Sequence, residues 1–499
     1  MNLARLISET ATKYADKPAI IFEGKTWTYQ DFDRQVKNYA ATIKQLGITK
    51  GDRVAIQLPK SIEFLFWHFA SISIGAIVIP LNPDYRPEEI VYFLTDSSSS
   101  LFVTNRNLHS KAQSAIQHLS KLQILIQEEI SLQKQSSTLE YATGGDEIAM
   151  ICYTSGTTGR SKGAAISHQN LIANMQSLHQ AWEWSDRDVL LHTLPLFHVH
   201  GLNVAALGCL YAGATMIMFE RFEPRRVWET LASDHCTIFM AVPTIYQRLI
   251  NAWESLELKP NLEEMRLFIS GSAPLSDRQF HQFEKLTGFR ILERYGMTET
   301  GMNASNLVAP EHRKAKSVGF PLSCVEVRVV NPDGSDVERS EVGEVWIRGA
   351  NVFQGYWQMP EKTAEAFIDG WFRTGDLGFQ DADDRDRLYL VGRAKELIIT
   401  GGFNVYPKEI ENVLESHEAV KESAVIGLLD QDFGEKVVAA IAFKDGMSIA
   451  PEALIAHCKA YLASYKCPKQ IFFVRSLPRN AMGKIQKNIL AQQIQKESS

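Results

Sequence analysis

The most informative segment of this chain reads Tyr153-Thr154-Ser155-Gly156-Thr157-Thr158-Gly159-Arg160-Ser161-Lys162-Gly163. It follows the apolar run 148–152, which predicts a buried strand leading into a loop. Glycines let a backbone wrap around an anion with its N–H groups pointing inward. Hydroxyl side chains add donors, and Arg160 and Lys162 supply positive charge for a polyphosphate. An ordinary Ser/Thr/Gly surface turn is the alternative, but it does not account for the cations directly after a buried strand.

The loop differs from a Walker P-loop, which ends in a Gly-Lys-Ser/Thr triplet that this segment lacks. It resembles instead the phosphate-binding loop of the adenylate-forming enzymes, which include acyl-CoA synthetases, firefly-type luciferases and peptide-synthetase adenylation domains. The resemblance implies that ATP binds here, and the residues it assigns to ATP are Thr154, Ser155, Gly156, Thr157, Thr158, Gly159 and Lys162.

Length and composition limit the classes of protein to consider. A chain of 499 residues is too long for one hydrophobic core, so we expect at least two domains. The net charge of −6 gives no reason to expect a nucleic-acid partner. The six cysteines are scattered without metal-binding spacing, as is typical of a reducing compartment. The N-terminus lacks the apolar core of a signal peptide, and no apolar run is long enough to span a bilayer, so we expect a cytoplasmic protein without a membrane span.

The pattern of apolar residues predicts the fold class. Strand-like runs at 19–22, 53–58 and 76–80 alternate with helix-like runs, one of them at about 31–45 after the cap residue Thr28. Such alternation predicts parallel-type sheets flanked by helices. Apolar and polar residues then alternate from about 321, which predicts a β-rich subdomain over about 321–393. We therefore predict an α/β protein with a large N-terminal domain, 1–393, and a small α+β C-terminal domain, 394–499.

Two further motifs extend the resemblance to the middle of the chain. Gly271-Ser272-Ala273-Pro274 follows a buried strand, which is a standard ligand position in α/β folds, and the family places it against adenine. The run 292–300 matches the second signature of the family. There the resemblance assigns Tyr295 and Gly296 to the nucleotide, Thr298 to phosphate and Glu299 to Mg²⁺, a cation that prefers oxygen ligands. Taken alone, Glu299 would be read as a surface acid.

The sugar of the nucleotide has its own candidate residues. Asp376 lies in Gly375-Asp376-Leu377-Gly378 and corresponds by position to the ribose-binding aspartate of the family, with Arg393 as a second ribose contact. An Asx-turn is the structural alternative for Asp376. His198, in Phe197-His198-Val199-His200, resembles a pocket wall that borders acyl substrate and nucleotide, and the histidines have no local set of metal ligands.

The C-terminal segment resembles the mobile domain of the family. Lys484 matches the catalytic lysine, which a loop inserts into the active site. Relatives use two arrangements that pivot at the position of Lys395, and the second brings Gly401 and Gly402 beside coenzyme A. The resemblance implies ATP, Mg²⁺ and coenzyme A, and a reaction in which a carboxylate forms an acyl-adenylate and then an acyl-CoA. Such chemistry needs positioning and charge neutralisation rather than a protein nucleophile.

Arg294 narrows the choice of acid. Many relatives have a small or apolar residue there, and a buried guanidinium is costly unless it meets an anion such as a second substrate carboxylate. The runs 292–306, 197–202 and 400–407 resemble malonyl-CoA synthetases, whereas Leu307 and 321–324 depart from them. We therefore expect malonate or methylmalonate as the substrate. The alternatives are that Arg294 pairs with Glu293 or another acid, and that the chain is a short-chain, medium-chain or aryl acyl-CoA synthetase or a carrier-loading adenylation enzyme. The sequence leaves the oligomeric state, monomer or dimer, open.

Overall fold

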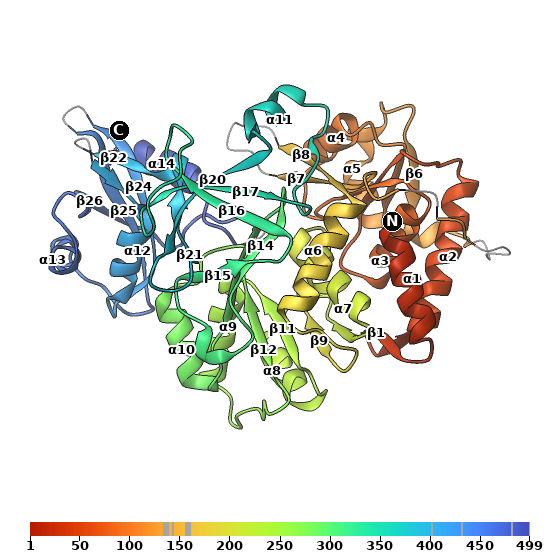
Figure 1. Cartoon of the computed structure of the whole chain (residues 1–499), viewed down its shortest axis with the longest axis horizontal. Helices are drawn as coiled ribbons and strands as arrows, with labels where there is room; N and C mark the ends of the chain where they lie inside the picture. Colours follow the sequence, from red (N-terminus) through yellow and green to blue (C-terminus); the bar gives the residue numbers. More distant parts are fainter. Residues whose placement is uncertain are drawn as a thin grey trace.

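The computed structural model describes residues 1–132, 139–141, 144–154, 161–400, 403–430, 433–480 and 483–498 (Figure 1). Within these ranges the strands form three sheets that are flanked by helices. Two of the sheets belong to the large N-terminal part and the third to the smaller C-terminal part, so the predicted α/β class is confirmed. In Figure 1 the C-terminal elements, in blue, lie at the opposite end of the molecule from the red N-terminal helices.

The first sheet is mainly parallel, as the alternation of strands and helices predicts. Its order among the described residues is β18 (Gly355–Tyr356), β8 (Lys162–Ser167), β7 (Ile148–Thr154), β4 (Ile77–Pro80), β3 (Arg53–Gln57), β5 (Leu101–Thr104) and β6 (Gln123–Ile126). The helices α4 (Pro87–Asp96) and α5 (Arg106–Ile116) pack their apolar side chains on one face of this sheet.

The second sheet joins a parallel half to an antiparallel half. Its order in the described part of the chain is β16 (Val325–Val330), β17 (Gly343–Gly349), β20 (Trp371–Asp381), β21 (Arg387–Arg393), β15 (Ser317–Pro321), β14 (Gly301–Ser305), β13 (Leu292–Met297), β12 (Leu267–Ser270), β11 (Ile238–Ala241), β9 (Val189–His192), β10 (Thr215–Met218), β1 (Pro18–Phe22) and β2 (Lys25–Thr28), with β19 (Phe367–Ile368) paired to β20. The β-rich segment expected at about 321–393 thus continues the large sheet, because β14 bonds to both β13 and β15.

The helices of the large part form where local signals place them. Thr28 Oγ1 accepts the N–H of Asp31 at 3.0 Å and forms a capping box, so α2 spans Tyr29–Gln45, close to the predicted 31–45. In α3 (Ile62–Ser73) every side chain except Glu63 is buried, since this helix packs in the core shared by the two sheets. The remaining helices are α1 (Leu3–Lys13), α6 (His168–Ala181), α7 (Leu207–Ala212), α8 (Pro224–Ser233), α9 (Pro243–Glu254), α10 (Asp277–Thr287) and α11 (Pro360–Ala366).

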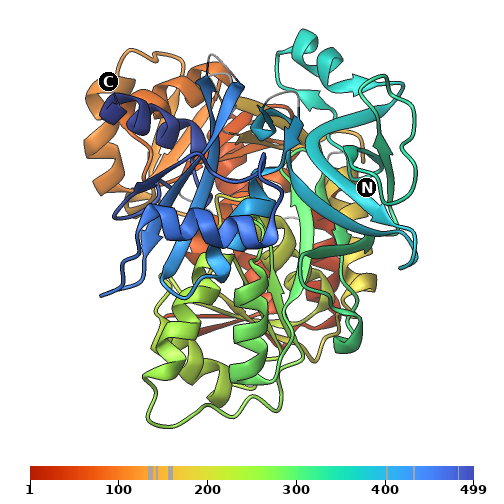
Figure 2. The same ribbon diagram turned by 90° about the vertical axis from the view of Figure 1, so that its left-hand side faces the viewer.

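The C-terminal part has a separate core. Its sheet runs β23 (Phe403–Val405), β22 (Ile398–Thr400), β25 (Gly434–Phe443) and β24 (Val420–Asp430), with β26 (Gln470–Phe473) paired to β25. The helices α12 (Pro407–Ser416) and α13 (Pro451–Tyr461) cover one face, and α14 (Lys487–Ser498) packs against the other; Figure 2 shows these elements in front. A short 3₁₀ turn, Ala394–Glu396, joins this part to β21, and the domain boundary at 393/394 stays a prediction.

Membrane insertion finds no support in the helices that are described: none combines the length and the apolar character that a bilayer span requires.

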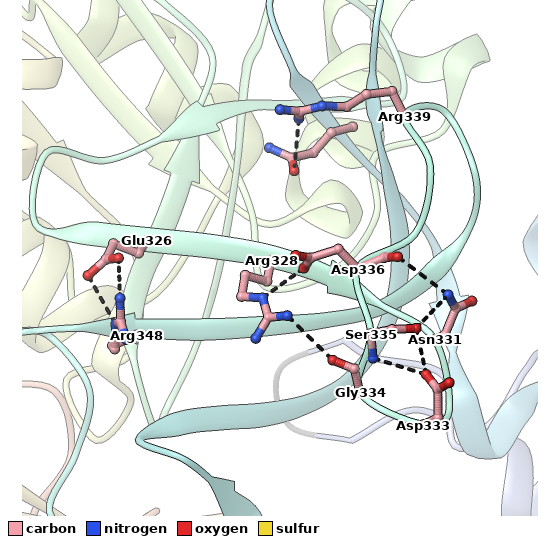
Figure 3. Close-up of polar contacts among 10 residues, drawn as sticks. Glu326, Arg328, Asn331, Asp333, Gly334, Ser335, Asp336, Arg339 and Arg348 are labelled. Atoms are coloured by element: carbon pink, nitrogen blue, oxygen red, sulfur yellow. Dashed lines mark hydrogen bonds and ion pairs between the residues drawn. The ribbon is translucent and has the colours of Figure 1, made fainter.

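Two glycines with nearly the same backbone angle differ in what surrounds them. Gly319 in β15 has φ +85°, and a Cβ there would lie 2.0 Å from the carbonyl oxygen of Ser305. Gly334 has φ +86° in the turn after β16, where a Cβ would meet only the ring of Trp346 at 3.5 Å. Figure 3 shows this turn, in which the Gly334 carbonyl accepts a hydrogen bond from Arg328. Gly319 is therefore required by the approach of two strands, and Gly334 only by its left-handed backbone.

We predict that Gly319→Ala lowers the free energy of unfolding by more than about 3 kcal/mol, because β14 and β15 must separate where Gly319 meets Ser305. Gly334→Ala carries only the left-handed strain and should cost about 1–2 kcal/mol. Urea or thermal unfolding of both variants checks this. Equal losses would contradict the proposed backbone contact.

Candidate active site

Asp376 is the centre of one cluster of predicted residues. Its Oδ2 accepts a hydrogen bond from the Tyr295 hydroxyl at 2.6 Å, and its Oδ1 pairs with Nε of Arg393 at 2.9 Å. Asp376 and Arg393 are direct partners in the β20–β21 ladder, so Asp376 lies within a strand rather than in an Asx-turn. Asp376 raises the pKa of Arg393, and burial raises the pKa of Tyr295. The predicted ribose residues and Tyr295 therefore meet at one buried carboxylate.

Lys484 reaches the same region from the C-terminal part. Its N–H donates to Asn480 Oδ1 at 3.0 Å, and Gly483, with φ +74°, lies so close to Thr244 of α9 that a Cβ would be 2.8 Å from Thr244 Oγ1. Burial lowers the pKa of the Lys484 ammonium, the positive charge of Arg393 lowers it further, and Asp376 opposes the shift. The loop that carries Lys484 is thus seated against the large part, next to the Asp376 cluster.

Glu299 forms a second cluster with a residue that the sequence did not single out. The Tyr356 hydroxyl donates to Glu299 Oε1 at 3.1 Å, and the Lys162 ammonium lies 3.9 Å from the centre of the Tyr356 ring. Tyr356 enters the site because β18 pairs with β8, which begins at Lys162. The local sequence does not predict this contact, since Tyr356 is far from both partners in the chain. On the other side of β8, Thr154 of β7 pairs with Lys162.

A magnesium ion is implied by the family, and the donor set can be tested for it. In the described residues no group of three or more His, Cys, Asp or Glu side chains could hold a metal. Glu299 is buried, and burial raises its pKa, so a cation at this carboxylate would compensate a penalised charge. A single carboxylate fits Mg²⁺, which usually completes its shell with water and substrate phosphates.

Arg294 is buried and 3% exposed, yet its guanidinium lacks the partners that such burial requires. Among the described residues, Nε and Nη2 have no hydrogen-bond partner and no carboxylate lies within ion-pair distance. The neighbouring Glu293 projects to the opposite face of β13 and accepts the N–H of Leu275 at 2.9 Å. Burial lowers the pKa of Arg294 to about 9. The alternative of an Arg294–Glu293 ion pair is therefore not observed.

The surroundings of Arg294 bring other predicted residues together. A Cβ at Gly271 would lie 2.3 Å from Cζ of Arg294, so a larger residue there would have to displace the guanidinium. His200 Nδ1 shares a hydrogen bond with Ser272 Oγ at 3.2 Å, and His200 Nε2 is buried without a partner among the described residues. Burial and the Arg294 charge lower the pKa of His198 to about 4 and that of His200 well below its usual value. This anion pocket, as we call Gly271, Ser272, Arg294, His198 and His200, presents neutral imidazoles around one cation.

Thr298 borders a small cavity of about 20 Å³, room for one water molecule. Its lining mixes amide side chains (Asn170, Asn174, Asn203 and Asn351) with apolar ones (Ile166, Leu171, Val199 and Val204). The Oδ1 atom of Asn351 is buried without a partner among the described residues.

The other predicted residues fall into two groups. Gly296 lies in β13, where a Cβ would be 2.2 Å from the carbonyl oxygen of Gly301; Ala273 and Pro274 complete the turn after β12; and Lys395 is exposed in the 3₁₀ turn. The predicted loop residues Ser155, Gly156, Thr157, Thr158, Gly159, Gly401 and Gly402 lie outside the described residues.

The buried carboxyl of Glu293 generates a prediction about pH. Burial raises its pKa from 4.5 to about 7, although Leu275 N–H, Lys408 and Arg294 favour the charged form. A raised carboxyl pKa contributes stability that is complete below pH 4.5 and lost as the pH rises through 7. Glu293→Gln keeps an acceptor for Leu275 and lacks the titration. Its unfolding free energy relative to wild type should therefore rise by about 3 kcal/mol from low pH to pH 8.

Urea unfolding at pH 5, 6, 7 and 8 measures this difference, and Glu338→Gln, at an exposed position, is the control. A pH-independent difference between wild type and Glu293→Gln would contradict the burial argument.

Known proteins resemble this chain over nearly its whole length. The pattern of the AMP-binding enzyme family matches residues 7–357, and that of the AMP-binding enzyme C-terminal domain matches residues 409–484. The mitochondrial malonate–CoA ligase of Mus musculus is 35% identical over 97% of this chain and 90% of that protein. The oxalate–CoA ligase of Arabidopsis thaliana is 34% identical over 98% of both chains. A long-chain-fatty-acid–CoA ligase of Yersinia pestis is 31% identical over 97% of this chain and 93% of its own.

Solved structures agree over the full length. ATP-bound MatB from Rhodopseudomonas palustris is 38% identical, covers 100% of both chains and superposes with a TM-score of 0.92. The apo form of the same protein, with the same coverage, reaches 0.82. The chain as a whole thus superposes better on the ATP-bound form than on the apo form. The whole-chain match and the two sequence patterns lead to one conclusion: the chain belongs to the AMP-binding enzyme family and is an AMP-forming acid–thiol ligase of the acyl-CoA synthetase type.

Proposed function

We propose that this enzyme joins a small dicarboxylic acid, malonate or methylmalonate, to coenzyme A. The observation that carries the proposal is the buried guanidinium of Arg294, which has two N–H-bearing nitrogens without a partner in the described part of the chain. A buried cation of this kind is stabilised by an anion that arrives with the substrate. The second carboxylate of malonate supplies that anion in the fork geometry that a guanidinium binds.

The size and polarity of the surroundings support a short acid. Gly271 brings the backbone against the Arg294 guanidinium, and Ser272 and His200 add hydrogen-bonding groups beside it. The cavity at Thr298 holds about one water molecule, which leaves no room there for a long hydrocarbon chain. The names of two relatives, a malonate–CoA ligase and an oxalate–CoA ligase, point to dicarboxylates as well, whereas the fatty-acid ligase has the same overall similarity.

The proposed chemistry has two steps. The reacting carboxylate attacks the α-phosphorus of ATP, pyrophosphate leaves, and an acyl-adenylate remains; the coenzyme A thiol then attacks the acyl carbon and AMP leaves. We assign the ribose to Asp376 and Arg393, the phosphates to Thr298 and the loop from Thr154 to Lys162, and Mg²⁺ to Glu299. Bound Mg²⁺ would neutralise phosphate charge. Lys484 offsets the charge that develops on the α-phosphoryl oxygens, because its ammonium is held in a site with little water.

The second step needs another geometry. The face of the C-terminal part that carries Lys484 cannot also hold coenzyme A at the same acyl carbon, so we propose that this part pivots at Lys395 and brings the 401–402 loop to the thiol. We also propose that the enzyme is cytoplasmic.

Lys484→Ala should lower the rate of acid-dependent ATP–pyrophosphate exchange by about two or more orders of magnitude, because the cation acts on the adenylation transition state. Thioester formation from supplied malonyl-adenylate and coenzyme A should change less than threefold. Lys466→Ala, which removes a lysine of the same domain paired with Glu409, is the control. Equal losses in both steps would assign Lys484 to folding or to general binding.

A panel of acids scored by pyrophosphate release, with coenzyme A present, tests the substrate. The panel includes oxalate, malonate, methylmalonate, succinate, butyrate, benzoate and palmitate. Malonate or methylmalonate should give the highest kcat/KM. Arg294→Met should lower that value several-hundredfold, since losing one member of a buried charge pair costs on the order of 3–5 kcal/mol.

Two further measurements separate substrate binding from folding in this variant. Arg294→Met should reduce the preference for malonate over butyrate and leave ATP affinity unchanged. Its unfolding temperature without substrate should equal or exceed that of wild type, because an unpaired buried charge is removed. A wild-type preference for a fatty or aromatic acid would refute the dicarboxylate proposal and leave the family assignment intact.

A further inference from the structure

Arg278 connects the large part of the enzyme to the C-terminal part. It is the second residue of α10, and its Nη1 donates to the carbonyl oxygen of Val420 at 3.0 Å and, more weakly, to that of Glu415 at 3.4 Å. Glu415 lies in the last turn of α12, and Val420 begins β24. Figure 1 shows α10 beneath α12, so a side chain of one part caps a helix end of the other.

The position of this arginine is unfavourable for α10 itself. A cation in the first turn of a helix opposes the positive end of the helix dipole, and the same cation at the C-terminal end of another helix is stabilised. The last carbonyls of a helix lack backbone N–H partners within that helix, and the Arg278 guanidinium donates to one of those of α12, that of Glu415. Lys444 opposes the contact, because the Arg278 charge adds to burial in lowering the pKa of that lysine. The Arg278 side chain is therefore stabilised by the docked C-terminal part rather than by its own helix.

The first turn of α10 also adjoins the substrate site. It follows the turn Gly271–Pro274, then Leu275, whose N–H donates to Glu293, and the cap residue Ser276. The next residue, Gln279, donates to the carbonyl oxygen of Pro243 and to Gln247 Oε1, both at 3.1 Å, and so fixes the start of α9. Thr244, in that same turn of α9, contacts Gly483 beside Lys484. The first turn of α10 thus lies next to the turn Gly271–Pro274, to the start of α9 that contacts the Lys484 loop, and to the end of α12.

We propose that Arg278 is a positioning residue that holds the C-terminal part in the adenylating arrangement. This inference rests on the proposed role of Lys484 and on the proposed pivot at Lys395. A pivot that carries α12 away from α10 breaks both hydrogen bonds, so Arg278 stabilises one arrangement and not the other. It has no part in the chemistry of either step.

The ratio of the two half-reaction rates is the sharpest readout. If the arrangements exchange rapidly, each rate is proportional to the population of its own arrangement. A change that destabilises only the docked form then alters the ratio by the full factor, whichever form predominates. For two partly exposed hydrogen bonds from a charged donor that factor is about tenfold.

The experiment compares Arg278→Ala, Arg278→Lys, Arg225→Ala and Lys484→Ala with wild type. Arg225 is the matched control, because it is the exposed second residue of α8 and its side chain makes no hydrogen bond or ion pair with described residues. Adenylation is measured as ATP–pyrophosphate exchange with malonate, and thioester formation as the reaction of supplied malonyl-adenylate with coenzyme A. Unfolding temperatures confirm that each variant is folded.

Arg278→Ala should lower the ratio of adenylation to thioester rate about tenfold, Arg278→Lys should restore part of it, and Arg225→Ala should leave it unchanged. An unchanged ratio in Arg278→Ala, or equal losses in both steps, would overturn the inference. If Lys484→Ala spares adenylation, the proposed role of Lys484 fails instead. If wild type does not adenylate malonate, the substrate proposal fails, and the same ratio is measured with the acid that the panel selects.

Discussion

The hydrogen bond and ion pair of the buried Asp376 carboxylate are the interactions on which the candidate nucleotide site depends. A charge in such surroundings is tolerated only when hydrogen bonds and an opposite charge compensate it, and here Tyr295 and Arg393 do so at 2.6 and 2.9 Å. The two partners come from different strands of the large sheet. The 3₁₀ turn to the C-terminal part begins directly after Arg393, and Lys484 lies close enough for Asp376 to influence its pKa. Asp376 therefore lies close to the candidate ribose site, the start of the linker and the candidate catalytic loop.

The buried charge of Arg294 differs from that of Asp376. Asp376 is satisfied by Tyr295 and Arg393, whereas two guanidinium nitrogens of Arg294 have no partner among the described residues. Glu299 is intermediate: Tyr356 donates to it, yet burial still raises its pKa. Such groups reduce the stability of the free enzyme and become favourable when a ligand of opposite charge arrives. The anion pocket at Arg294 and the carboxylate at Glu299 thus differ from the structural ion pairs on the surface, which are exposed and contribute little.

The sheets explain how residues from distant segments come together. Because β18 pairs with β8, Tyr356 lies beside both Lys162 and Glu299. Because β13 places alternate side chains on opposite faces, Arg294 and Glu293 point to opposite sides of the sheet. Gly319 lets β15 approach β14 and so joins the antiparallel strands that carry Asp376 to the parallel strands that end at the substrate turn.

The amino-acid sequence alone determined the fold class, the helix start at Thr28, the order of the motifs and the unusual character of Arg294, because periodicity, capping and short motifs act over a few residues. It did not reveal Tyr356, the hydrogen bonds of Arg278 or the absence of an Arg294–Glu293 ion pair. These depend on strand pairing, on the face of a strand and on the docking of one part of the chain against another. Such contacts join residues that are far apart in sequence or face opposite ways, so only the tertiary structure decides them.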